Sequence, residues 1–128
     1  MTCSLIPVLL AACLSAAPPS DGFFAAVRQV ESAGNDRALG DCGRSVGPYQ
    51  CGLLAWLDGG GKRRDWPRLA YSRTATERVM RAYWARYGAA TDEDRARCWN
   101  AGPKWRTRAR SASAAYWKRV RAELGRHP

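Results

Sequence analysis

Apolar and polar positions along this chain repeat at helical rather than strand-like spacing. Val79, Met80, Tyr83 and Tyr87, for example, would share one face of a helix. Similar patterning predicts helices over about 23–32, 52–57, 74–87, 91–100 and 111–124. Residues 33–50 are rich in Gly, Asn, Asp and Ser, which favours a loop with a minor hairpin around 36–50. The pattern therefore predicts one small, mainly α domain with no dividing linker.

Local signals suggest where some of these helices begin. Asp21 can cap the first helix, because a side-chain oxygen at that position accepts a free backbone N–H of the first turn. Thr74–Glu77 (TATE) has the form of a capping box and is expected to open the third helix. Thr91 precedes three acidic residues that suit the positive end of a helix dipole, so we expect it to open the fourth.

The N-terminal segment differs from the rest of the chain in composition. Residues 1–20 carry no charged side chain, and the apolar stretch Leu5–Ala17 is too short to span a bilayer comfortably. Such a stretch suits the apolar part of an export signal. We therefore expect residues 1–20 to be an export signal and residues 21–128 to be the functional domain.

Two processing signals compete within this leader. Ser15 and Ala17 resemble the small-residue site of ordinary leader cleavage, which would leave a secreted or periplasmic protein. Leu10–Cys13 (LAAC) instead resembles a bacterial lipobox, in which Cys13 becomes the lipid-bearing first residue at the cell envelope. The residues leave both alternatives open.

Three cysteines follow the leader: Cys42, Cys51 and Cys98. An odd number in an exported protein allows one disulfide and one free thiol, or no disulfide. We favour a Cys51–Cys98 bridge, which would close a long loop, and keep Cys42–Cys51 as the local alternative.

Charge and histidine content narrow the classes of function. The formal net charge of +10 predicts attraction to polyanions such as nucleic acid, anionic membrane or acidic cell-wall polymer. The single histidine, His127, stands next to the C-terminus, which argues against Ser-His-Asp and Cys-His nucleophiles and against zinc sites built on several histidines. An enzyme with this sequence is therefore expected to use carboxylates, with no metal and no other cofactor.

Glu31 is an anomaly in the first predicted helix. It shares a face with Phe24 and Val27, so an acidic group falls on the apolar side in the last turn. Desolvation and the negative end of the helix dipole would both raise the pKa of this carboxyl, which could then act as a general acid near neutral pH. The alternative is a surface glutamate that turns to solvent or pairs with an arginine.

Four ordered blocks carry a resemblance to a known family: Glu31–Ser32, Ser45–Gln50 (SVGPYQ), Trp99–Pro103 (WNAGP) and Tyr116–Val120 (YWKRV). In this order and spacing they resemble the lysozyme superfamily, closest to invertebrate-type lysozymes and their bacterial relatives. Goose-type lysozymes and soluble lytic transglycosylases are further off. The resemblance spans about residues 23–124 and implies a small lysozyme-like fold, although Ala101 departs from the family's usual N-G-G-P turn.

The resemblance implies roles for single residues. Glu31 would be the general acid, and the Ser45 hydroxyl would orient its carboxyl. Tyr49 and Gln50 would point into a sugar groove, with the Tyr49 ring stacked on a sugar. Asn100 would offer its amide to an N-acetyl group or a sugar hydroxyl. The alternatives are ordinary capping roles for Ser45 and Asn100 and a core position for Tyr49.

Asp41 is expected to be the second carboxylate. It lies ten residues after Glu31 in a loop that should fold back over the groove. Within one residue of alignment it matches the second catalytic aspartate of invertebrate-type lysozymes. Asp36 is the competitor, and a turn aspartate bonded to its own backbone is the structural alternative. If no aspartate reaches the site, a lytic transglycosylase using Glu31 alone is the fallback.

We therefore predict a peptidoglycan-cleaving muramidase that acts on the β-1,4 bond between N-acetylmuramic acid and N-acetylglucosamine. Its partner would be peptidoglycan or a related N-acetylated polysaccharide. We expect a monomer that binds no nucleic acid and meets a membrane only through a lipid on Cys13. Rival hypotheses are a non-catalytic basic protein that binds cell wall or nucleic acid, and a sugar-binding lysozyme-like domain that has lost catalysis.

Overall fold

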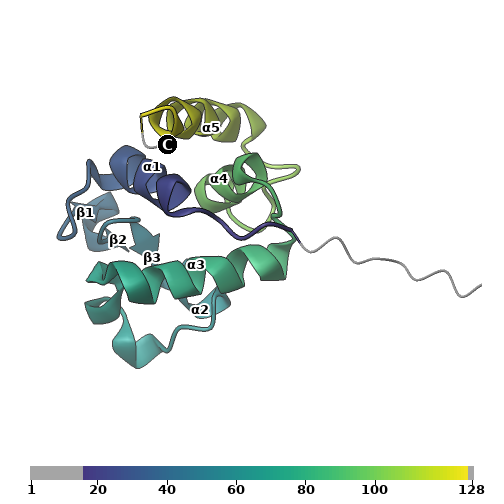
Figure 1. Ribbon diagram of the computed structural model, residues 1–128. Coiled ribbons are helices and arrows are strands. Elements are labelled where there is room, and N and C mark those ends of the chain that lie inside the picture. The colour runs from purple at the N-terminus through teal and green to yellow at the C-terminus, as the bar shows by residue number, and fades with distance from the viewer. Residues whose placement is uncertain (1–15, 127–128) are drawn as a thin grey trace, which may run out of the picture.

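The computed structural model describes residues 16–126, and within this range the chain forms five α-helices and a small sheet (Figure 1). The helices are α1 Asp21–Ser32, α2 Leu53–Asp58, α3 Arg73–Tyr87, α4 Asp92–Ala101 and α5 Arg110–Leu124. Short 3-10 helices lie in the connections: η1 Asp41–Gly43, η2 Arg63–Asp65 and η3 Arg68–Tyr71. The predicted mainly α architecture is confirmed.

Three two-residue strands form the sheet: β1 Leu39–Gly40, β2 Ser45–Val46 and β3 Cys51–Gly52. They run antiparallel in the order β1-β2-β3, with Leu39 opposite Val46 and Ser45 opposite Gly52. The predicted hairpin is present, and a third strand joins it. Strands this short show no alternation of apolar and polar positions, so the sequence pattern could not reveal the third one.

The main core lies where α1 packs between α3 and α5 (Figure 1). Phe23 and Phe24 of α1 are almost completely buried, and both rings contact Trp84 of α3, with ring centres 5.7 and 5.8 Å away. Tyr116 and Val120 of α5 belong to the same cluster. This packing holds the helix whose last turn carries the predicted acid.

A second buried cluster joins the sheet to α2 and α3, and its members are Val46, Cys51, Trp56, Ala70 and Val79. Trp56 donates its indole N–H to the backbone oxygen of Lys62 at 3.0 Å, which holds the glycine-rich turn after α2 against this cluster. Trp66 donates in the same way to the Cys51 oxygen at 3.2 Å. The loop between α2 and α3 is thereby attached to the sheet.

Two of the predicted helix starts are displaced. Ser20, rather than Asp21, caps α1: its hydroxyl oxygen accepts the backbone N–H of Phe23 at 3.1 Å. Asp21 lies in the first turn, where its charge suits the helix dipole. Similarly, Ser72 caps α3 before the predicted TATE box begins, by accepting the N–H of Ala75 at 3.2 Å. In both cases a serine just upstream takes the capping position.

The predicted disulfide is not present among the described residues. Cys42, Cys51 and Cys98 are all free thiols. Cys51 packs in the smaller cluster and Cys98 in the main one, whereas Cys42 is exposed on the η1 turn. Burial raises the pKa of both the Cys51 and the Cys98 thiol to about 12, so neither is a ready thiolate.

Most of the predicted export signal, with Cys13, lies outside the described residues. The described part begins at Ala16 and leads into α1. Arg95 of α4 donates a hydrogen bond to the Ala17 backbone oxygen at 2.5 Å, so this short segment contacts the folded domain. Within residues 16–126 no helix has the length and apolar character needed to cross a membrane.

Tyr49 lies in the core, which contradicts the expectation that its ring stacks on a sugar. Its side chain is fully buried, and its ring packs edge-on against Phe24. The hydroxyl accepts from Arg28 of α1 at 2.6 Å and donates to Glu77 of α3. Tyr49 therefore ties the loop before β3 to two helices.

Replacing Tyr49 by phenylalanine should lower the free energy of unfolding by about 1–3 kcal/mol, because Arg28 and Glu77 would lose the partner they share in a partly buried site. Urea denaturation followed by circular dichroism measures this change. Tyr71→Phe is the control, since no hydrogen bond of the Tyr71 hydroxyl occurs within residues 16–126. An unchanged midpoint for Tyr49→Phe would contradict this structural role.

Candidate active site

Glu31 lies in the last turn of α1, half-buried beneath α5. Tyr116 of α5 donates its hydroxyl hydrogen to Glu31 Oε1 at 2.7 Å. The end of the helix is fixed by the neighbouring residue, because the Ser32 hydroxyl donates to the Pro48 backbone oxygen at 2.8 Å. Ala33 then adopts a left-handed conformation and ends α1. The carboxyl is therefore held at a defined position between α5 and the loop before β3.

The surroundings of Glu31 favour its neutral form. Burial raises the pKa of this carboxyl from 4.5 to about 7, and the negative charge of Asp41 adds to the increase. The Tyr116 hydrogen bond and the positive charge of Arg119 act in the opposite direction, because both stabilise the carboxylate. The direction of this shift agrees with the expectation from the sequence, with desolvation as the main cause, and it leaves a large fraction of the carboxyl protonated near neutral pH.

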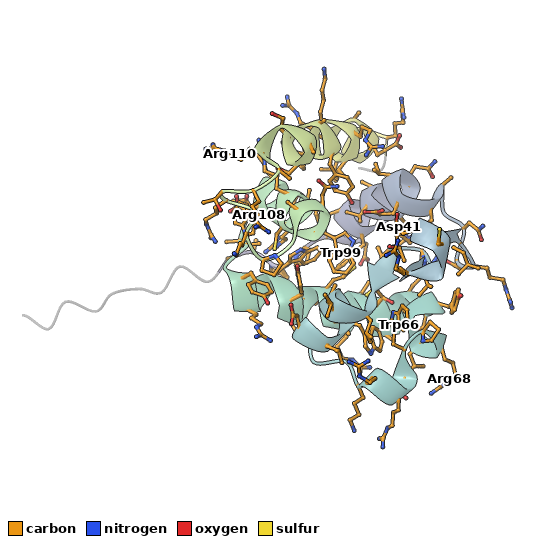
Figure 2. All side chains as sticks on the ribbon, turned by 180° about the vertical axis from the view of Figure 1, so that it is seen from behind. Asp41, Trp66, Arg68, Trp99, Arg108 and Arg110 are labelled. Atoms are coloured by element: carbon orange, nitrogen blue, oxygen red, sulfur yellow. The ribbon has the colours of Figure 1, made fainter. Side chains whose placement is uncertain are left out.

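Asp41 begins the η1 turn and is exposed. Figure 2 shows it between the sheet and α1. Its negative charge makes a small contribution to the raised pKa of Glu31, after the larger effect of burial. Asp41 and Cys42 both have left-handed backbones, with φ of 49° and 57°, a conformation that non-glycine residues rarely adopt. Such backbone strain often accompanies functional turns.

Ser45 contacts Asp41 and not Glu31. Its hydroxyl donates to Asp41 Oδ2 at 2.7 Å, so the structure does not show the expected contact between Ser45 and the Glu31 carboxyl. The competitor Asp36 is engaged elsewhere, in an ion pair with Arg73 of α3 at 2.7 Å. Of the two candidate aspartates, Asp41 is the one whose charge contributes to the raised pKa of Glu31.

Gln50 shapes the loop that carries Asp41. Its amide nitrogen donates to the backbone oxygens of Ala38, at 3.2 Å, and Gly47, at 3.0 Å. Its amide oxygen lies so close to Gly40 that a Cβ atom there would be 2.2 Å away, so a larger residue at position 40 would displace the Gln50 amide. Gln50 is thus occupied by its own hairpin, and its contribution to a substrate site is indirect.

Asn100 and Trp99 differ in their availability. Asn100 is exposed in the last turn of α4, and its amide has no hydrogen-bond partner among residues 16–126. Trp99 (Figure 2) donates its indole N–H to the Tyr49 backbone oxygen at 3.0 Å and packs edge-on against Tyr83. Asn100 can therefore meet a ligand, whereas Trp99 supports the core.

Tyr116 is the residue that the sequence analysis passed over. It stands in one of the four quoted blocks, and its spacing from Val120 places both on one helix face, but no role was assigned to it. The hydrogen bond from its hydroxyl to Glu31 depends on how α5 crosses α1, and the helical periodicity of the sequence does not predict that crossing.

Among residues 16–126 no group of three His, Cys, Asp or Glu side chains is placed to hold a metal ion.

Comparison with known proteins assigns a class to this fold. No protein-family model matches the chain, and a search of curated proteins finds no match. Among solved structures, the crystal structure of the Tapes japonica lysozyme matches with a TM-score of 0.68 and 25% sequence identity, over 81% of this chain and 91% of that chain. That neighbour is an invertebrate-type lysozyme. The chain thus has a lysozyme-like fold, as its resemblance implied, and this supports a muramidase-like function in general terms.

Tyr116→Phe should move the alkaline limb of the pH–activity profile to higher pH. Glu31 can donate a proton only while protonated, so activity should fall as pH rises through a pKa of about 7. Removing the Tyr116 hydroxyl removes a hydrogen bond that stabilises the carboxylate, which raises that pKa further. The profile of kcat/KM on cell-wall fragments measures the shift.

Lys118→Gln, on the same helix, is the matched control and should leave the alkaline limb where it is. A limb in Tyr116→Phe that stays at the wild-type pH, or moves to lower pH, would contradict the assignment of Glu31 as the titrating acid.

Proposed function

We propose that the protein is a muramidase that hydrolyses the β-1,4 bond between N-acetylmuramic acid and N-acetylglucosamine in peptidoglycan. The observation that carries this proposal is the carboxyl group of Glu31 in the last turn of α1, whose pKa is raised by burial and, to a smaller extent, by the charge of Asp41. The raised pKa of Glu31 is about 7, and Asp41 is exposed. A lysozyme-like fold with these two carboxyl groups supports glycoside hydrolysis.

Glu31 would supply the proton. Its carboxyl protonates the glycosidic oxygen, the bond to the anomeric carbon breaks, and the leaving sugar takes the proton. The carboxylate that remains is stabilised by the Tyr116 hydroxyl and by the positive charge of Arg119. The same two groups therefore limit the pKa of the acid and prepare the site for its ionised form.

Asp41 would act at the anomeric carbon. As a carboxylate it can attack that carbon, stabilise its developing positive charge or activate a water molecule. The Ser45 hydroxyl holds Asp41 Oδ2, which leaves the other carboxylate oxygen for this work. Asn100, exposed on α4, would bind an N-acetyl group or a sugar hydroxyl.

The distribution of charge suits a cell-wall substrate. Residues 95–122 contain nine Lys and Arg and no Asp or Glu. Arg108 and Arg110 are exposed at the turn into α5 (Figure 2). Cell walls carry peptide carboxylates and often phosphate polymers, which such a surface attracts at low ionic strength. The protein would act outside the cytoplasm, secreted, periplasmic or anchored through Cys13, as a monomer.

Glu31→Gln should reduce cell-wall hydrolysis by at least about 10²-fold, because the amide keeps the size of the side chain but has no proton to transfer. The rate of release of soluble fragments from purified peptidoglycan measures the loss. Thermal unfolding and sedimentation with insoluble peptidoglycan serve as controls, and both should match wild type. Near-wild-type turnover in Glu31→Gln would remove Glu31 as the acid.

Asp41→Asn distinguishes hydrolysis from the lytic transglycosylase alternative. With two working carboxylates, this change should cost activity on the scale of Glu31→Gln, and the wild-type protein should release ordinary reducing N-acetylmuramic ends. Mass spectrometry of the products provides the measurement. Full activity in Asp41→Asn, together with 1,6-anhydro products from wild type, would instead establish a mechanism that uses Glu31 alone.

A further inference from the structure

The segment that precedes α1 is packed against the far end of the molecule. In Figure 1 it runs from the start of α1 to the region where α3 ends and α4 begins. Ala16, Pro18 and Pro19 form one wall of a groove of about 390 Å³, whose other walls include Trp84 and Ala89. Residues 16–20, predicted from the sequence to belong to the export signal, are thus part of the folded surface.

Arg95 makes the specific contact in this region. Its side chain is only 8% exposed, although it carries a full positive charge. The guanidinium donates to the Ala17 backbone oxygen at 2.5 Å and pairs with Asp92, one turn earlier in α4, at 3.5 Å. A buried charged donor is costly to leave without its acceptors. The hydrogen bond to the Ala17 carbonyl therefore offsets part of the free-energy cost of burying the Arg95 guanidinium.

Cleavage between Ala17 and Pro18 would damage this contact in two ways. The Ala17 carbonyl would leave with the leader, so the guanidinium would lose its backbone acceptor. The new amino terminus at Pro18 would add a second positive charge close to that of Arg95, whose ion-pair partner is Asp92. Cleavage further upstream keeps the carbonyl and places the terminal charge farther away.

We propose that the mature protein retains residues 16–20 as part of its folded domain, and that the leader is removed upstream of them. Of the two processing signals in the sequence, the one at Ser15–Ala17 is incompatible with this anchoring, whereas Leu10–Cys13 is compatible. The mature chain then begins at Cys13. This inference is independent of the proposed glycosidase activity.

The first residue of the processed protein tests the proposal. The full-length gene is expressed in a bacterial host, the protein is isolated from the cell envelope and medium, and the N-terminal peptide is identified by mass spectrometry. A chain that begins at Cys13 supports the proposal. A chain that begins at Pro18 or later, or one that still begins at Met1, overturns it.

Two variants of the full-length gene show which of the two processing signals is used. Ala17→Gln removes the small residue that ordinary leader cleavage needs and keeps the backbone carbonyl, so the first residue should still be Cys13. Cys13→Ala removes the Leu10–Cys13 signal, so processing that leaves residue 13 as the first residue should no longer occur. The reverse pattern, in which only Ala17→Gln changes processing, would contradict the proposal.

Arg95→Gln in the mature protein tests the contact itself. It should lower the melting temperature by about 4 °C or more and speed hydrogen exchange in the N-terminal peptide that includes Ala17. Arg97→Gln is the control on the same helix, because Arg97 pairs with Glu93 and not with the N-terminal segment. Equal exchange rates in wild type and Arg95→Gln would show that the segment is not anchored, and would contradict the inference.

Discussion

The packing of α5 across the last turn of α1 is the contact on which the candidate site depends. It leaves Glu31 half-buried, with the Tyr116 hydroxyl as its polar partner. The aromatic core around Phe23 and Phe24 fixes α1 at its other end. Displacing either helix would hydrate Glu31 and return its pKa towards the ordinary value, which would remove the neutral acid at physiological pH.

Asp41, the proposed second carboxylate, lies in a hairpin that is connected to the same helix through a different set of contacts. The Ser32 hydroxyl donates to the Pro48 oxygen, and the Tyr49 hydroxyl bonds to both Arg28 of α1 and Glu77 of α3, so hydrogen bonds connect the end of α1 to the loop before β3. Gln50 then braces the hairpin that presents Asp41. The position of Asp41 relative to Glu31 is therefore set by backbone carbonyls and buried polar groups, which are stiffer than an exposed loop alone.

Helical periodicity predicted the α-helices. The position of Glu31 on the apolar face of the first helix predicted that its carboxyl would be partly buried and its pKa raised. Both signals are local, because they need only the spacing of residues within one helix. The partners of Tyr49 and Ser45 could not be predicted in this way. The Tyr49 hydroxyl donates a hydrogen bond to Glu77, which is 28 positions away in the sequence. The Ser45 hydroxyl donates to Asp41 because the hairpin brings the two side chains together. Pairing of cysteines likewise depends on how separate elements pack, and Cys51 and Cys98 fall in different clusters.

The half-buried position of Glu31, beside the Tyr116 hydroxyl and the charge of Asp41, should keep a large fraction of its carboxyl protonated near neutral pH. Carbon-13 NMR of the glutamate side-chain carboxyls, with Glu31→Gln used to assign the signal, measures this directly. We expect the Glu31 carboxyl to titrate with a midpoint of about 7. A midpoint near the ordinary glutamate pKa of about 4.3 would contradict it.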